Sequence, residues 1–225
     1  MRRTLPNPLI RFRRVQIDRP GPGEELNATS VITEPRQAAS VIVLRGGAST
    51  LELLLVRRTE QARFMGGVWV FPGGAVDAHE GEGDAAHRLA AVREVDEEAG
   101  ITLGEPSSLV KYSRWITPAA ISIRFDTHFF LAPLPDGEAP RVDGSEITDA
   151  RWYTPQAALD AHIREEIPLV FPTIKHLEQL APFDSADALM DYASGREVVP
   201  VIPKVVMTGE IARVVLPGEP GYDAA

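Results

Sequence analysis

Apolar residues in this chain gather in short runs, and the spacing of these runs predicts a mixture of strands and helices. Residues 39–44 and 51–57 form two such runs around a Gly-Gly turn, so they predict a hairpin-like pair of strands. Residues 68–71 predict a third short strand. Pro72-Gly73-Gly74 follows it, and there we expect a tight turn.

A helix is expected after this turn. Between residues 84 and 99 apolar side chains recur at intervals of three and four, with Asp84 suited to cap the first turn and Gly100 suited to end the helix. Thr154 and Pro155 mark a second helix start, with Thr as the cap and Pro in the first position. Similar patterns predict strands within 108–115, 121–132 and 150–153, helices over 156–164, 171–180 and 186–193, and one or two strands in the C-terminal tail.

These elements fit a single α+β domain, of mixed α/β order, with an extension at each end. We divide the chain into a basic N-terminal arm (1–37), a main domain (38–165) and a C-terminal helical extension and tail (166–225) that packs on the same domain. Partial alternation over residues 9–17 predicts a short edge strand within the arm.

Composition excludes several classes of protein. The 225 residues include no cysteine, which excludes a disulfide framework, a thiolate zinc site, an iron–sulfur cluster and a cysteine nucleophile. The longest strictly apolar runs have four residues, whereas a bilayer span needs about 20. We therefore expect no membrane segment and a cytoplasmic protein.

Charge is distributed unevenly along the chain. The net charge is −9, yet residues 1–20 hold six arginines and one acid, so these 20 residues carry +5 and the remaining 205 carry −14. An acidic body repels a phosphate backbone, so we do not expect a nucleic-acid polymer as the main partner. The arm is then solvated or contacts a second copy of the chain, while a small anion held through metal ions fits the acidic body.

The densest candidate chemistry lies near the end of the helix expected over 84–99. Glu94 is three positions from Glu97 and four from Glu98, so the three carboxylates share one helix face. Arg93 is placed to hold Glu97 in an i,i+4 pair. Clustered oxygen donors favour Mg²⁺ or Mn²⁺ over zinc. The alternative is a solvated acidic face, which is common on surface helices.

The residues before this helix favour the metal-binding interpretation. Gly73 and Gly74 follow a strand directly, and a glycine pair lets the backbone approach a ligand or metal closely. The combined pattern resembles the motif of the Nudix hydrolases: a strand, then Pro-Gly-Gly, then a helix with Arg-Glu-x-x-Glu-Glu-x-Gly. Five residues separate Gly74 from Glu80, as in that motif, but twelve rather than seven separate Glu80 from Arg93.

The resemblance covers roughly residues 38–160 and implies the Nudix fold, an α/β/α sandwich with a mixed β-sheet. It also implies hydrolysis of the diphosphate bond in a nucleoside diphosphate linked to another group, with Mg²⁺ or Mn²⁺ as the cofactor. In such an enzyme Arg93 orients the carboxylates and Glu80 braces the loop. By matching position, the resemblance implies a catalytic metal site formed by Glu94, Glu97, Glu98 and Gly74.

The general base and the substrate contacts are less closely defined by the motif. The base lies in the motif helix or on a later loop, where Glu146 is our candidate; an exposed loop glutamate without a catalytic role is the alternative. Arginines can bind phosphates by bidentate contacts, although arginines paired with surface acids are the alternative. The candidates for substrate binding are Arg58, Arg63, Arg124, Gly73 and Gly74.

A narrower resemblance, carried by residues 54–74 and 115–130, is to a subgroup of Nudix enzymes that cleave coenzyme A. Coenzyme A or an acyl-CoA is therefore the suggested substrate, while ADP-ribose, NADH, dinucleoside polyphosphates and nucleotide sugars stay open. A non-catalytic Nudix-fold ligand sensor is the alternative of another class, but such a protein can lose the metal glutamates and none is missing here. The Nudix-fold isomerases use a cysteine, which this chain lacks. Members of the family often pair through terminal extensions, which is consistent with a homodimer.

Overall fold

The computed structural model of the chain describes residues 27, 32–62, 65–208 and 211–224. The edge strand expected over residues 9–17, and most of the basic arm, lie outside this part. In chain order the elements are β1 (Arg36–Arg45), β2 (Glu52–Arg58), β3 (Trp69–Val70), β4 (Gly73–Ala75), η1 (Ala78–Glu80), α1 (Gly83–Ala99), η2 (Pro106–Ser108), β5 (Val110–Ile116), β6 (Phe125–Pro133), β7 (Ile147–Tyr153), α2 (Pro155–Ile163), α3 (Phe171–Leu180), α4 (Ala186–Ala193), β8 (Pro200–Val201), β9 (Lys204–Thr208) and β10 (Ile211–Val215).

The centre of the molecule is a mixed sheet of eight strands. Its main order is β3-β2-β1-β6-β5-β8, with β4 also paired to β1 and β7 also paired to β2. The β1–β6 and β5–β8 pairs are parallel and the other pairs are antiparallel. Strands β9 and β10 form a separate antiparallel hairpin.

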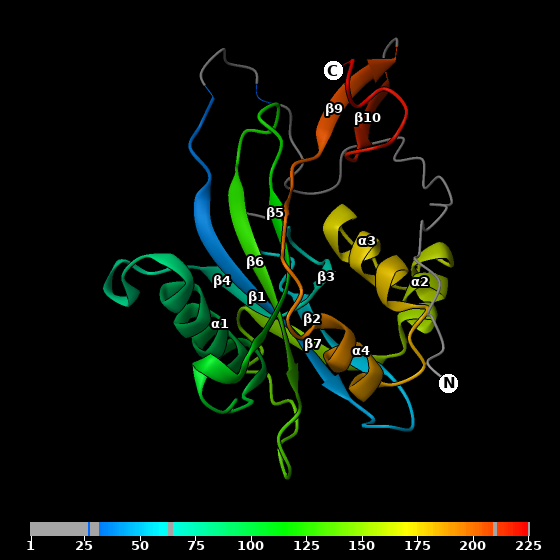
Figure 1. The fold of residues 1–225 in the computed structure, drawn as a ribbon. Coiled ribbons are helices and arrows are strands. Elements are labelled where there is room, and N and C mark those ends of the chain that lie inside the picture. Colours follow the sequence, from blue (N-terminus) through cyan, green and yellow to red (C-terminus); the bar gives the residue numbers. More distant parts are fainter. Residues whose placement is uncertain (1–26, 28–31, 63–64, 209–210, 225) are drawn as a thin grey trace.

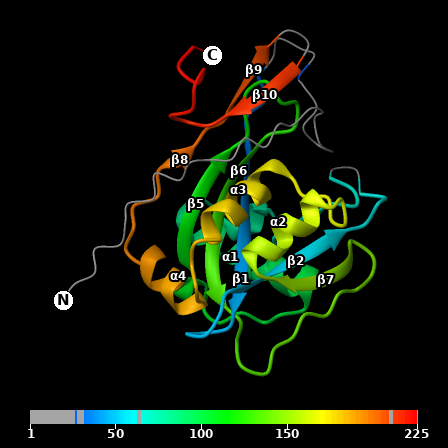
Figure 2. The same cartoon turned by 90° about the vertical axis from the view of Figure 1, so that its right-hand side faces the viewer.

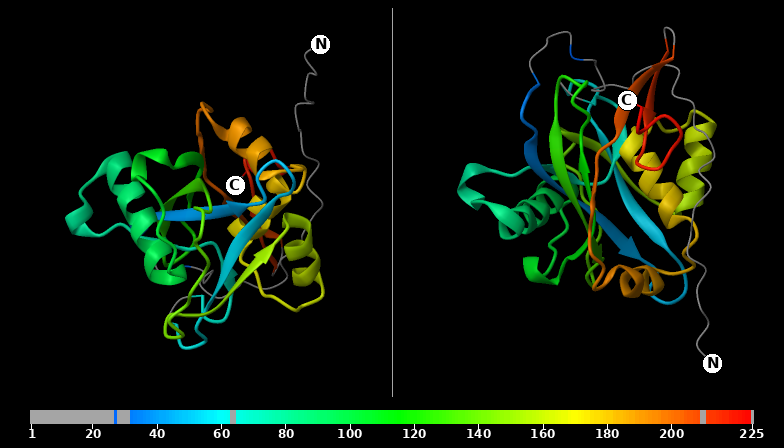
Figure 3. Two further views of the ribbon diagram at one scale, coloured as in Figure 1. Left: turned by 90° about the horizontal axis from the view of Figure 1, so that it is seen from below. Right: turned by 45° about the horizontal axis from the view of Figure 1, so that its top comes forward.

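Helices cover both faces of this sheet (Figures 1 and 3). On one face α1 places Ala90, Ala91 and Val95 against apolar side chains of β1, β2 and β6, and these residues are buried. On the other face α2, α3 and α4 pack against the opposite side chains of the same strands, because successive residues of a strand point to opposite faces. The predicted α/β/α sandwich with a mixed sheet is confirmed.

The C-terminal helices follow their local sequence signals closely. Helices α3 and α4 have the bounds expected from their apolar spacing, and the Thr154 side chain accepts a hydrogen bond from Ala157 N–H at the start of α2. Helix α1 ends as expected at Gly100, which adopts the left-handed conformation (φ 60°) that favours glycine. It begins two residues earlier than expected, at Gly83, because the cap position is Glu82; Asp84 does not cap it but pairs with Arg88 and Lys111.

One expectation about the strands was wrong. The Pro-Gly-Gly segment is not a simple turn, because Gly73–Ala75 forms β4 and pairs with residues 38–40 of β1. Within the stretch 121–132 the expected strand begins at Phe125, since Ile121 N–H bonds back to the Pro118 carbonyl in a turn. The strand around residues 150–153 extends back to Ile147, where it pairs with Arg58 of β2.

The hairpin β9–β10 stands over one end of the sheet, close to α3 (Figures 1 and 2). It follows a segment that runs along β5 and pairs there as β8. Among the helices of the described residues, none combines the length and the apolar character needed to cross a bilayer.

A buried histidine of α3 makes stability depend on pH. His176 is fully buried, and its Nδ1 donates to the Pro172 carbonyl while its Nε2 accepts from the Ser113 hydroxyl at 2.6 Å. Burial lowers the pKa of His176 to about 4. The unfolded chain therefore binds a proton that the folded chain excludes between pH 6.5 and about 4, so the free energy of unfolding falls as pH drops through this window.

We expect this histidine to account for about 3 kcal/mol of that loss. Urea unfolding followed between pH 7 and 4 should show a shallower decline for His176→Gln than for the parent. Exposed His79 gives the matched control, because its replacement by Gln should leave the slope unchanged. Parallel declines in the parent and in His176→Gln would contradict this explanation.

Candidate active site

Glu98 is the most deeply buried of the candidate metal ligands. Its side chain is 5 % exposed, one oxygen accepts from Gly73 N–H at 2.9 Å, and the other lies 3.5 Å from Arg58 Nη1. Burial raises the pKa of the Glu98 carboxyl to about 7; the Gly73 N–H and Arg58 oppose this rise, and the charges of Glu94 and Glu146 add to it. An acid in this position is poised to change its charge near neutral pH when no cation is present.

Glu94 lies one helical turn before Glu98 and faces the same loop. Its side chain is 14 % exposed and accepts from Arg93 Nη1 at 2.7 Å. Burial raises the pKa of Glu94 as well, while Arg93 opposes the rise. The carboxylate lies against Gly74 so closely that a Cβ at Gly74 would be 2.3 Å from Glu94 Oε1. This contact explains why a glycine is needed at that point of the loop.

Arg93 connects the helix to the loop that precedes it. Its guanidinium donates to both oxygens of Glu80, at 3.0 and 3.3 Å, and to the Ala75 carbonyl at 3.0 Å. Glu80 also accepts from Asp77 N–H at 2.7 Å, and its side chain is only 5 % exposed. The five residues added between Glu80 and Arg93, relative to the Nudix motif, therefore do not move Glu80 away from Arg93. The geometry fits the bracing role expected of Glu80.

Two further glutamates lie at the edge of this group. Glu97 is exposed and accepts from Arg93 Nη1 at 2.9 Å, as its spacing predicts. Glu146 is exposed on the loop before β7, which is held to β2 by a bond from Thr59 N–H to the Glu146 carbonyl. Its charge contributes to the raised pKa of Glu94 and of Glu98, so the fold brings this distant residue to the same carboxylate cluster.

The three arginines expected at the substrate have different positions. Arg58 lies beside Glu98, and its Nε is buried with no hydrogen-bond partner within the described part of the chain. Arg124 donates to the carbonyls of Thr117 and Thr33, so its guanidinium holds two backbone segments. Substrate binding by Arg124 stays a prediction. Arg63 lies outside the described residues.

The donor atoms here fit a hard divalent cation. All of them are oxygens, and the two buried carboxylates repel one another, which a cation would relieve. Over the ranges that the structure describes, no three His, Asp or Glu side chains are arranged to hold a metal ion as they stand. The reason is visible in the contacts: Arg93 draws Glu94 and Glu97 to itself, while Gly73 and Arg58 hold Glu98.

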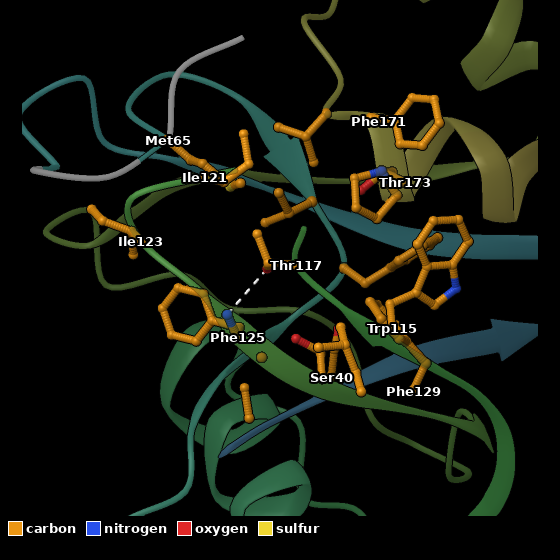
Figure 4. A pocket seen from close by; sticks show the side chains of 18 of the residues that line it. Ser40, Met65, Trp115, Thr117, Ile121, Ile123, Phe125, Phe129, Phe171 and Thr173 are labelled. Carbon is orange, nitrogen blue, oxygen red and sulfur yellow. Dashed lines mark hydrogen bonds between the residues drawn. The ribbon is translucent and has the colours of Figure 1, made fainter. Parts of the chain in front are cut away.

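A cavity of about 510 Å³ opens beside these carboxylates. Arg58, Gly73 and Gly74 belong to its lining, so it is continuous with the candidate site. Figure 4 shows Trp115, Phe129 and Phe171 gathered on one side of the space and Met65, Ile121 and Ile123 on the other. Most of this lining was missed by sequence reasoning, because its residues come from β5, β6, α3 and the tail and share no local motif.

Comparison with known proteins fits this geometry. The family model described as the NUDIX domain matches residues 34–173 of the chain. The chain belongs to the Nudix family. The match includes β1 through the start of α3, and so contains the whole carboxylate cluster described above.

Individual Nudix proteins extend this result. Nudix hydrolase 7 of Caenorhabditis elegans is 26 % identical, with 77 % of this chain and 69 % of that protein covered. Acyl-coenzyme A diphosphatase NUDT19 of Homo sapiens is 23 % identical, with 91 % and 82 % covered. The crystal structure of a NUDIX hydrolase from Alicyclobacillus acidocaldarius is 29 % identical and superposes with a TM-score of 0.63, covering 72 % of this chain and 97 % of that one. The prediction of a Nudix hydrolase is confirmed, and the curated relatives fit the coenzyme A diphosphatase-like subgroup.

The two glycines of the Nudix loop should respond differently to alanine. A Cβ at Gly73 would lie 2.5 Å from the Ala39 carbonyl oxygen and 2.6 Å from Ser40 Cα, so β4 must separate from β1. We expect Gly73→Ala to lower the free energy of unfolding by about 1–3 kcal/mol. For a Cβ at Gly74 the three nearest atoms all belong to the carboxylate at the end of the Glu94 side chain.

Gly74→Ala should therefore displace a carboxylate and lower kcat by about tenfold or more, with a smaller loss of stability than Gly73→Ala. Thermal unfolding and steady-state kinetics on both variants test the pair. If Gly73→Ala and Gly74→Ala lost the same stability and kept the same activity, the expected difference between the two glycines would be contradicted.

Proposed function

We propose that this Nudix hydrolase uses Mg²⁺ or Mn²⁺ to cleave the diphosphate bond of a nucleoside diphosphate linked to another group, with coenzyme A or an acyl-CoA as the favoured substrate. One observation carries the proposal: the buried Glu98 carboxylate and the half-buried Glu94 carboxylate meet the Gly73-Gly74 backbone and Arg58 at one end of a cavity. The coenzyme A preference is supported by the relatives named acyl-coenzyme A diphosphatase.

In this proposal Glu94 and Glu98 are the main metal ligands, with Glu97 assisting and the Gly74 backbone completing the site. A bound divalent cation would neutralise the diphosphate, orient it and lower the pKa of an attacking water. Arg93 holds the carboxylates at the correct spacing through its bonds to Glu80 and Glu94.

The substrate phosphates are held by this chain's own donors. Within the described ranges the buried Nε of Arg58 has no hydrogen-bond partner, which suits it to donate to a phosphate oxygen that approaches Glu98. The exposed carboxylate of Glu146 takes the proton from the attacking water, since it lies close enough to influence Glu94 and Glu98 yet remains in contact with solvent.

The test is a phosphate-release assay with Mg²⁺ or Mn²⁺ and a coupled phosphatase, run against coenzyme A, an acyl-CoA, ADP-ribose, NADH, a dinucleoside polyphosphate and a nucleotide sugar. Selective release from coenzyme A or its thioester is expected. Preference for ADP-ribose or NADH would retain the mechanism and replace the substrate. No release from any compound, with binding still visible as a thermal shift, would instead favour the ligand sensor.

A further inference from the structure

We propose that the cavity beside the carboxylates binds an apolar, aliphatic arm of the substrate, and that the C-terminal hairpin β9–β10 sets the size of arm accepted. This inference rests on the proposed function, because it assigns the part of the substrate that lies beyond the diphosphate. Its starting point is continuity: Gly73, Gly74 and Arg58 line one end of the cavity, so a diphosphate placed there directs its substituent into the apolar space. In an acyl-CoA this substituent is the pantetheine arm with the aliphatic acyl chain at its far end.

The walls of the cavity suit hydrocarbon better than a nucleobase. The Ser40 hydroxyl already donates to the Pro72 carbonyl, and the Thr117 hydroxyl oxygen accepts from Phe125 N–H. The Trp115 ring nitrogen lies on the side of the ring away from the space (Figure 4). A nucleobase placed in this cavity would lose its hydrogen bonds to water and would form few new ones with the protein. An aliphatic chain makes no hydrogen bonds to water, so it loses none on entering.

The hairpin supplies part of the wall from outside the Nudix domain match. Val205 of β9 and Val214 of β10 both line the cavity, with Pro203 just before β9. Val205 and Val214 are direct cross-strand partners, so their side chains lie on one face of the hairpin. The matched Nudix segment ends at residue 173, so this wall is an addition of the C-terminal tail.

The mouth of the cavity has an exposed apolar side chain. Ile123 is 42 % exposed, which is unusual for a large apolar residue in a cavity wall. Its position, with Met65 and Ile121 nearby in Figure 4, extends the apolar surface toward solvent.

The test measures kcat/KM for acetyl-, hexanoyl- and decanoyl-coenzyme A. We expect KM to fall about two- to fourfold for each added methylene until the space is filled, with kcat nearly constant, because the arm is remote from the bond that breaks. Val205→Phe occupies the cavity from the hairpin side. It should lower the ratio of kcat/KM for decanoyl- over acetyl-coenzyme A by about tenfold or more.

Val206→Phe is the matched control, because Val206 pairs with Arg213 on the opposite face of the same hairpin. It adds the same ring and should keep the parental ratio. Equal kcat/KM across the three thioesters, or a parental ratio in Val205→Phe, would overturn the inference while leaving the hydrolase intact.

Calorimetric titration separates the two proposals when no thioester is cleaved. In that case the substrate assignment fails, and the affinities of coenzyme A and decanoyl-coenzyme A decide the inference. Tighter binding of the decanoyl thioester that Val205→Phe weakens and Val206→Phe does not would support the cavity assignment. Equal affinities of the two compounds would overturn it.

Discussion

Glu98→Gln is expected to lower kcat by about 10³-fold or more while leaving the fold intact. The amide keeps the size of the side chain and can still accept from Gly73 N–H, but it removes the negative charge that the proposed cation needs. The effect should appear in kcat more than in KM, because the lost interaction strengthens as the diphosphate bond breaks.

Stability provides a second readout for Glu98→Gln. In chelator, above the pKa of about 7, the parent carries an ionised carboxylate that burial disfavours. The neutral amide avoids this cost, so the unfolding midpoint of the variant should equal or exceed that of the parent. Asp96→Asn is the control, since Asp96 is exposed on the same helix and should change neither quantity. Near-parental turnover of Glu98→Gln would remove Glu98 from the proposed mechanism.

Arg93→Met is expected to lower the free energy of unfolding by about 3 kcal/mol and kcat by about 10²-fold or more. Removing Arg93 leaves the Glu80 carboxylate, whose side chain is only 5 % exposed, without its ion-pair partner. Glu94 also loses the donor that fixes its carboxylate. Urea unfolding and steady-state kinetics measure the two effects separately.

The double variant Glu80→Gln with Arg93→Met tests whether this loss comes from the pair. The double variant should be less destabilised than the sum of the two single variants, because the uncompensated carboxylate is then absent. Additive losses would show that Arg93 acts on stability through its bond to Ala75 or by packing, and not through Glu80.

The sequence allowed the motif helix and the C-terminal helices to be predicted because their signals are local. Thr154 and Pro155 define the start of α2 within two residues, and Gly100 ends α1 by its left-handed conformation. The carboxylates on one face of α1 follow from helical spacing alone, and the bond from Arg93 to Glu97 is the i,i+4 contact expected.

The parts of the fold and of the site that could not be predicted depend on contacts between segments distant in the sequence. Gly73-Gly74 has the composition of a turn, and only the approach of β1 makes it a strand. Arg124 has the charge expected of a phosphate ligand, yet its donors are used by two carbonyls, one of them 91 positions away in the chain. The wall formed by Val205 and Val214 has no sequence signal, because a valine pair in a tail is common whether or not it faces a cavity.

The parallel pairing of β1 with β6 also has a consequence for how the chain folds. The residues that pair are 89 positions apart. The backbone hydrogen bonds on this side of β1 therefore cannot form until β6 has been synthesised. Such non-local pairing slows folding, because a long loop must close before its contacts form. On the ribosome the apolar residues 41–44 of β1 emerge well before their partners at 130–133. The nascent chain therefore passes through a stage in which this strand is open to association with other chains, and chaperones are expected to raise the yield of folded protein at that stage.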